Sequence, residues 1–140
     1  MPRHVEYGIA LLRVSLGVMF IAHGVLLKYV IYTLPGTAQF FESIGLPGFL
    51  AYLVFWMEAV GGAMLVLGIG TRWVSLALVP VLLGATWAHI GNGWVFSSAN
   101  GGWEYPLYLV VLAGAQALLG SGAFALRLPG FSPARSAVPA

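Results

Sequence analysis

The amino-acid sequence predicts an all-α membrane protein, a bundle of four transmembrane helices with both the N- and the C-terminus cytoplasmic. Three observations predict this fold class: the composition, the length of the apolar runs and the distribution of Lys and Arg. Hydrophobic residues make up 60% of the 140 residues and charged residues only 7%, whereas a soluble domain carries about 25% charged residues. Polar surface is too scarce to cover a water-soluble globule, so we expect the chain to lie in a lipid bilayer.

Four apolar segments approach or exceed the ~20 residues that a helix needs to cross about 30 Å of hydrocarbon. Backbone groups in lipid must find partners within their own segment, and the period-two alternation typical of strands is absent, so we expect helices. The segments lie at about residues 7–32, 49–69, 73–90 and 103–124. Together they form one transmembrane domain over residues 1–126.

Turn-forming residues separate the four segments. PGTAQFFESIGLPG, residues 35–48, is a longer loop with room for a short interfacial helix over 38–44. GIGTR, residues 68–72, predicts a tight turn between helices, and GNGWVFSSANGG, residues 91–102, predicts a polar, glycine-rich loop. Residues 127–140 are rich in Pro, Ala and Ser, and we expect them to form a flexible cytoplasmic tail.

The placement of Lys and Arg predicts the topology, because cytoplasmic loops carry an excess of these residues. The arginines fall at the N-terminal end, in the second connection and in the tail: Arg3, Arg13, Arg72, Arg127 and Arg135. The loops 35–48 and 91–102 contain neither Lys nor Arg. We therefore expect a multi-pass membrane protein with these two loops on the outer side.

Composition also argues against several classes of function. Six Lys and Arg against four Asp and Glu give a net charge of +2, and their scatter along the chain argues against a nucleic-acid partner. The chain has no cysteine, so it has neither a disulfide framework nor dithiol chemistry of its own. The spacing of His, Asp and Glu matches no metal-binding motif, so no metal ligands are assigned, and the sequence leaves open whether the His and Glu residues bind a metal.

Five ionisable residues fall in the middle or the outer half of the predicted helices. At about 1.5 Å of rise per residue, His23 and Lys28 lie roughly 22 and 30 Å from the cytoplasmic start of the first helix. Glu58 and His89 lie roughly 18 and 25 Å from the cytoplasmic turn, and Glu104 begins the last helix. A charge that faces lipid at such depth costs at least ~2.5–3.5 kcal/mol. We expect the five side chains to converge inside the bundle, with Lys28 at the rim.

Helical angles of about 100° per residue allow this convergence. On the first helix Gly17, Gly24 and Lys28 fall on the stripe that starts at Arg13. On the last helix Glu104, Tyr108, Val111 and Ala115 share a face that we expect to point inward.

The expected site has Glu58 as the central acid or base, and His23 and His89 as its candidate catalytic partners. We expect Gly24, Gly61 and Gly62 to leave room beside the carboxylate. The candidate ligand-binding residues are Lys28, Glu104, Tyr108, Gly24, Gly61 and Gly62. A purely structural role is an alternative for each of these residues. For Arg13 the structural role is favoured over a catalytic one. For Lys28 two roles are equally supported, a cation that extends its side chain to the membrane surface and a residue of the site.

Several motifs occur in a recognisable order: RVSLGVMFIAHG with a Lys after HG, then GLPG, EAVGGAMLVLGIGTR, WAHIGNGW and GGWEYPL. Over about residues 8–124 this order resembles the DoxX family of small bacterial four-helix membrane proteins. The matching positions are Arg13, His23, Gly24, Lys28, Glu58, Gly61, Gly62, Gly68, Thr71, Arg72, His89, Glu104 and Pro106. Some relatives, of the DoxD type, are similar to subunits of a thiosulfate:quinone oxidoreductase, and others are linked to membrane redox complexes. The resemblance therefore implies a link to redox chemistry and a location in the bacterial inner membrane.

Three functions remain open. The first is a membrane subunit of a redox complex, with soluble or membrane redox partners and an inter-helix pocket for a quinone or another small ligand. The second is a non-enzymatic scaffold or assembly factor that recruits soluble partners. The third is a small transporter, which would need a homo-oligomer because four helices leave little room for alternating access. No complete active site is recognisable, so the sequence does not decide whether the chain itself is catalytic.

Overall fold

The computed structural model describes residues 1–95, 97–99 and 101–126, and every regular element in this part of the chain is helical, which confirms the all-α prediction. The elements are α1 (Arg3–Ile21), a π-helix η1 (Ala22–Ile31), α2 (Leu34–Ser43), α3 (Phe49–Leu67), α4 (Thr71–His89), a 3₁₀ turn η2 (Ile90–Asn92) and α5 (Glu104–Leu119). The expected tail, residues 127–140, lies outside the described residues.

Three helical stretches have the length and hydropathy to cross a membrane. They are Arg3–Ile31 (29 residues, mean hydropathy 2.0), Phe49–Leu67 (19 residues, 1.8) and Thr71–Asn92 (22 residues, 1.6). The last helix, α5, is also apolar but has only 16 residues, a rise of about 24 Å. It is shorter than the predicted 103–124, because the chain leaves the helix at Gly120, where φ is 85°.

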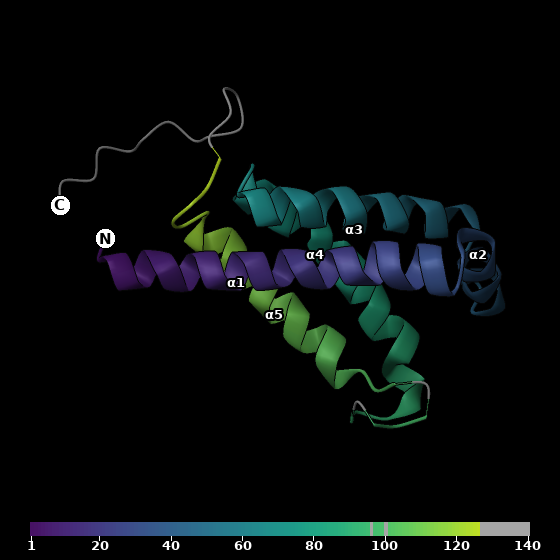
Figure 1. Cartoon of the computed structure of the whole chain (residues 1–140). Coiled ribbons are helices and arrows are strands. Elements are labelled where there is room, and N and C mark those ends of the chain that lie inside the picture. Colours follow the sequence, from purple (N-terminus) through teal and green to yellow (C-terminus); the bar gives the residue numbers. More distant parts are fainter. Residues whose placement is uncertain (96, 100, 127–140) are drawn as a thin grey trace.

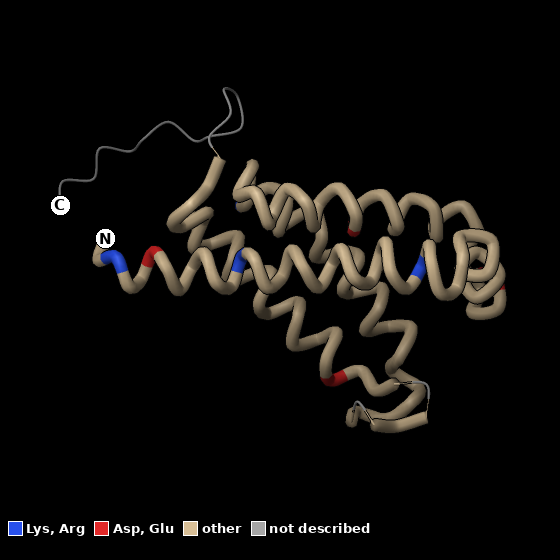
Figure 2. Tube along the Cα trace, viewed as in Figure 1, with Lys and Arg blue, Asp and Glu red and all other residues tan. Residues whose placement is uncertain are grey.

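The long helices pack as two pairs (Figure 1). The continuous helix α1–η1 lies along α3, and α4 lies along α5, while contacts between the pairs are fewer. The pairs meet near the N-terminus and diverge toward the end that carries α2 and the 91–103 loop. Charged residues are sparse along all of these helices (Figure 2), as a lipid-facing surface requires.

Backbone contact between two glycines sets the spacing of α1 and α3. A Cβ placed on Gly17 would lie 2.7 Å from the Gly62 carbonyl oxygen, and one placed on Gly62 would lie 2.8 Å from the Gly17 oxygen. Small residues at such a crossing allow two backbones to touch. Gly61 faces Leu78, which a Cβ would approach to 3.1 Å. The expectation that Gly61 and Gly62 leave open space is therefore wrong, because neighbouring helices fill the positions beside them.

The side chain of Arg13 ties three parts of the chain together. It is buried, with 1% of its surface exposed. Its Nη1 donates to the carbonyls of Leu65 (2.9 Å) and Val66 (3.0 Å) at the end of α3. Its Nε donates to the Ser121 carbonyl (2.8 Å), and its Nη2 to that of Ala123 (2.7 Å). The last carbonyls of a helix lack partners within it and carry partial negative charge, so a guanidinium suits them.

The segment after α5 returns across the same end of the bundle. Ala123 N donates to Glu6 O at 3.2 Å, and Leu126 N donates to Leu67 O at 2.9 Å. The Ser121 hydroxyl donates to the Thr71 hydroxyl at 2.9 Å. This end is thereby closed by hydrogen bonds that involve α1, the end of α3, the start of α4 and the chain after α5.

The short helix expected in the loop 35–48 exists, and it starts at Leu34, earlier than residue 38. Thr33 caps α2, because its Oγ1 accepts from Gly36 N at 3.2 Å, and Pro35 occupies the first turn, where its missing N–H is tolerated. Thr37 is buried and donates its hydroxyl to Thr33 O at 2.8 Å. The helix α2 packs on α3 and leaves Phe40 about half exposed.

Replacement of Arg13 by Lys should destabilise the fold, because a lysine cannot present the planar fork that reaches carbonyls on two sides. We expect the free energy of unfolding in detergent to fall by about 2–3 kcal/mol, the value of one or two charged hydrogen bonds. Arg3→Lys, at an exposed position, is the matched control. Equal melting temperatures for the two variants would contradict the role of Arg13.

Replacement of Gly62 by Ala should destabilise the α1–α3 pair by about 1–3 kcal/mol, as overpacking does. Gly114→Ala is the control, because nothing lies within 4 Å of a Cβ there and alanine favours a helix by about 0.5–1 kcal/mol. Reversible unfolding of both variants in the same detergent measures the difference. A Gly62→Ala variant as stable as Gly114→Ala would show that the contact does not set the helix spacing.

Candidate functional site

The π-helix η1 places His23 and Lys28 on the same side of the first helix. In an α-helix, residues five apart point in clearly different directions, whereas the i→i+5 hydrogen bonds of a π-helix bring the fifth residue back to the same face. Tyr32 N donates to Leu27 O at 2.8 Å in this pattern, and Lys28 Nζ lies 3.4 Å from the carbonyl of His23. π-Helical turns occur frequently at functional sites.

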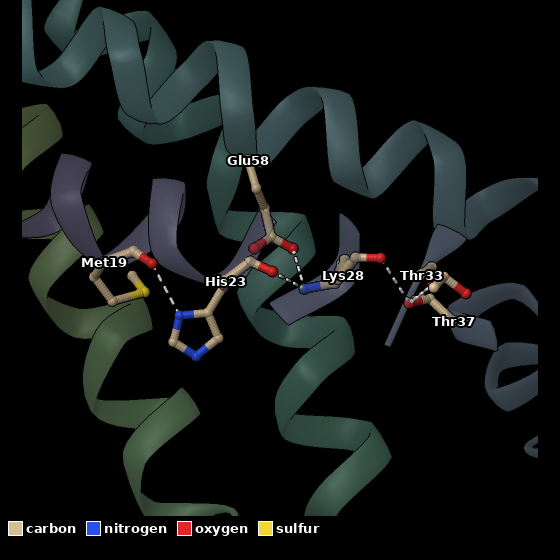
Figure 3. Close-up of polar contacts among 6 residues, drawn as sticks. All are labelled: Met19, His23, Lys28, Thr33, Thr37 and Glu58. Carbon is tan, nitrogen blue, oxygen red and sulfur yellow. Dashed lines mark hydrogen bonds and ion pairs between the residues drawn. The ribbon is translucent and has the colours of Figure 1, made fainter. Parts of the chain in front are cut away.

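An ion pair joins η1 to α3 (Figure 3). Lys28 Nζ lies 2.8 Å from Glu58 Oε1, and 18% of the lysine side chain and 5% of the glutamate side chain are exposed. The close approach depends on Gly24, because a Cβ there would lie 3.1 Å from the Cβ of Glu58. The charges of the two groups cancel, so this part of the site carries no net charge.

The histidines of the first and third long helices are held in the same way. His23 Nδ1 lies 2.9 Å from Met19 O (Figure 3), and His89 Nδ1 lies 2.8 Å from Ala85 O. A carbonyl only accepts hydrogen bonds, so Nδ1 carries the proton in both rings. In the neutral ring, Nε2 is then the nitrogen that can accept a proton.

A cavity of about 250 Å³ lies between the two helix pairs. Its lining comes from α1, η1, α3, α4, α5 and the loop before α5: Met19, Phe20, His23, Lys28, Glu58, Val81, Leu82, Ala85, His89, Gly101, Gly102, Tyr105, Pro106 and Leu109. A mostly apolar pocket with a few convergent polar groups is the usual form of a small-molecule site. Within the part of the chain that the structure describes, no group of three His, Asp or Glu is arranged to hold a metal ion.

The structure brings four predicted site residues around this cavity: His23, Lys28, Glu58 and His89. Gly24 lies behind Glu58, in the contact between η1 and α3. Glu104 and Tyr108 are exposed and do not line the cavity, so the expectation that they converge with the others is wrong. The inward face of α5 is set instead by its buried residues, Leu109, Ala113 and Gln116. An acidic residue in the first turn of a helix, such as Glu104, is already explained by the helix dipole.

The cavity residues that were not selected from the sequence include Gly101, Gly102 and Tyr105, in and next to the loop before α5. The loop before α5 folds back on itself, with Trp103 N donating to Gly93 O at 3.1 Å and Glu104 N to Trp94 O at 3.0 Å. A Cβ on Gly102 would collide with the Trp94 and Val95 carbonyls. The glycine pair was the available signal, because a backbone packed this closely tolerates no side chain.

A double-mutant cycle should show that Lys28 and Glu58 depend on each other. Lys28→Met and Glu58→Gln each leave one buried group without its partner, so each should destabilise the protein. The double variant should lose less than the sum, with a coupling free energy of roughly 0.5–3 kcal/mol. Unfolding of the four proteins in detergent measures this coupling. Additive losses would mean that the pair is not coupled in the folded protein.

Comparisons with known proteins show a family and a relative to which the chain is similar. The DoxX family model matches residues 8–91, which include His23, Lys28, Glu58 and His89. A protein of Bacillus subtilis (strain 168) with the name "Putative oxidoreductase CatD" is 42% identical over 85 residues, which are 61% of this chain and 61% of that protein. The match thus spans less than two thirds of the relative's length. No solved structure matches the chain.

The family match covers more than half of the chain, and it contains the same motifs around Arg13, His23 and Glu58 from which the resemblance was drawn. The protein belongs to the DoxX family.

Proposed function

We propose that the protein is a membrane subunit of an oxidoreductase complex and that its cavity binds the ring of a quinone or a similar lipid-soluble redox molecule. One observation carries this proposal: a buried ion pair and two histidines of fixed orientation line one mostly apolar cavity between the helix pairs. The family and the name of the Bacillus relative agree with a redox role.

The charge balance of the cavity favours a neutral ligand over an anion. Lys28 is the cationic side chain in the lining, and Glu58 already neutralises it at 2.8 Å. An anion would therefore lose its hydration without gaining an unpaired positive charge. Quinone oxygens need only hydrogen-bond donors, which the Lys28 ammonium and the Tyr105 hydroxyl supply.

The side chains around the cavity are suited to proton transfer. Reduction of a quinone to a quinol adds two electrons and two protons. The electrons would come from a redox partner protein, because the chain contains no cysteine for dithiol chemistry. The Glu58 carboxylate and the Nε2 atoms of His23 and His89 would first accept protons from water and then pass them to the quinone oxygens as general acids.

We also propose that the chain crosses the bacterial inner membrane four times, with both termini cytoplasmic. The loops at the α2 end and before α5 contain no Lys or Arg, whereas Arg13 and Arg72 lie at the opposite end of the helices. This distribution supports the orientation. The 16 residues of α5 fit a bilayer that thins locally beside a short helix.

The proposal is tested by purification in mild detergent followed by extraction and quantification of bound quinone. The wild type and Glu42→Gln, whose exposed carboxylate lies outside the cavity, should retain quinone. Glu58→Gln and His89→Gln should each retain about tenfold less, as expected when a ligand loses about 1.4 kcal/mol of binding free energy. His89→Gln matters because it breaks no ion pair, so it separates loss of the ligand from loss of the fold.

Two outcomes would contradict the proposed function. Quinone at the wild-type level in folded Glu58→Gln and His89→Gln would place the ligand elsewhere. Stoichiometric capture of soluble partners by a wild-type protein that holds no quinone would favour the scaffold role instead.

A further inference from the structure

We infer that the cavity exchanges protons and water with one side of the membrane only, the side of the loop before α5, because the Arg13 end of the bundle is closed. This inference rests on the proposed function in one respect: the exchanged protons are those of the proposed quinone reaction. The sealing itself rests on packing and hydrogen bonds that do not involve a ligand.

The floor of the cavity is a continuous apolar layer. Seven buried side chains from α1, α3, α4 and α5 form it: Leu16, Phe20, Leu65, Leu78, Leu82, Leu109 and Ala113, none more than 6% exposed. Phe20, Leu82 and Leu109 also line the cavity, so the layer begins where the cavity ends. A packed apolar layer offers water no hydrogen-bond partner and is expected to stay dry.

The rim of the cavity has the opposite character. Tyr105 is 45% exposed, and His89 and Gly101 are partly exposed. All titratable groups in the lining lie on this side of the apolar layer: His23, Lys28, Glu58, His89 and Tyr105. The exposed rim residues belong to the end of α4, the loop before α5 and the first turn of α5, so water reaches these groups from the loop side.

The guanidinium of Arg13 forms a second barrier to protons, on the side of the apolar layer away from the cavity. The guanidinium of Arg13 donates four hydrogen bonds to carbonyls, and within the described residues no carboxylate pairs with it. This permanent positive charge repels a proton that would approach from the same end. The contact between Gly17 and Gly62 closes the seam between α1 and α3 at this level.

The consequence for the proposed reaction is a fixed direction of proton exchange. Each quinone that is reduced in the cavity takes up two protons from the loop side, and each quinol that is oxidised there releases two protons to that side. In the proposed topology this is the outer side of the membrane.

Single cysteines test the inference, because the chain contains none. Ala85→Cys places a thiol in the cavity wall, and Ser75→Cys places one in a buried position beyond the apolar layer. Ser97→Cys and His4→Cys, at exposed positions in the 91–103 loop and at the N-terminal end, report the two sides. A charged, membrane-impermeant methanethiosulfonate is added to either side of sealed vesicles of uniform orientation.

The thiol of Ala85→Cys should react from the Ser97 side at least about tenfold faster than from the His4 side, a difference in barrier of about 1.4 kcal/mol. Ser75→Cys should stay protected from both sides. Comparable rates from both sides at residue 85, or reaction at residue 75 in a variant that melts like the wild type, would overturn the inference. Val81→Cys, also in the lining, replaces Ala85→Cys if that variant does not fold.

Failure of this inference is distinguishable from failure of the proposed function. One-sided labelling in a protein that retains no quinone would leave the closed end standing and refute the quinone site. Bound quinone with two-sided labelling would refute the closed end alone.

Discussion

The four hydrogen bonds of the Arg13 guanidinium are the constraint on which the rest of the structure depends. They bind α1 to the last carbonyls of α3 and to the segment after α5. A buried guanidinium is costly unless its donors are satisfied, and helix C-terminal carbonyls satisfy them with partial negative charge. Because this single group fixes three segments at one end, the two helix pairs can separate at the other end, where the cavity lies.

The buried ion pair between Lys28 and Glu58 has a different role from the Arg13 guanidinium. Apolar residues of similar volume often replace a buried ion pair without loss of stability, so the pair is weak support for a structural role. Lys28 and Glu58 instead form part of the wall of a cavity that also contains two histidines. Ionisable residues at membrane depth usually mark a pathway or a site, and here they lie where the helices diverge rather than where they are tied.

The π-helix and the glycines explain how apolar helices hold such a wall in place. The wider turn of η1 brings His23 and Lys28 to one side, and Gly24 allows that side to approach Glu58. Gly17 and Gly62 bring α1 and α3 into backbone contact one or two turns away. Close packing of one helix pair thus positions the polar groups, while the distance between the pairs leaves room for a ligand.

The sequence by itself determined the helical class, the apolar character of the long segments and the inward stripe of the first helix through Arg13, Gly17 and Gly24. Composition and period decide these features, because lipid leaves the backbone no alternative to helices. Depth along each helix also grouped His23, Lys28, Glu58 and His89 correctly, since position along a helix follows from residue count alone.

Only the tertiary structure decided which way each side chain faces around its helix. The face of α5 follows Leu109, Ala113 and Gln116 rather than Glu104 and Tyr108, because contacts with α4 outweigh the few polar residues in an apolar helix. The same holds for Gly61 and Gly62, whose neighbours come from other helices, and for Tyr105, which the folded loop places at the cavity. Such contacts join residues far apart in the chain, and no local pattern encodes them.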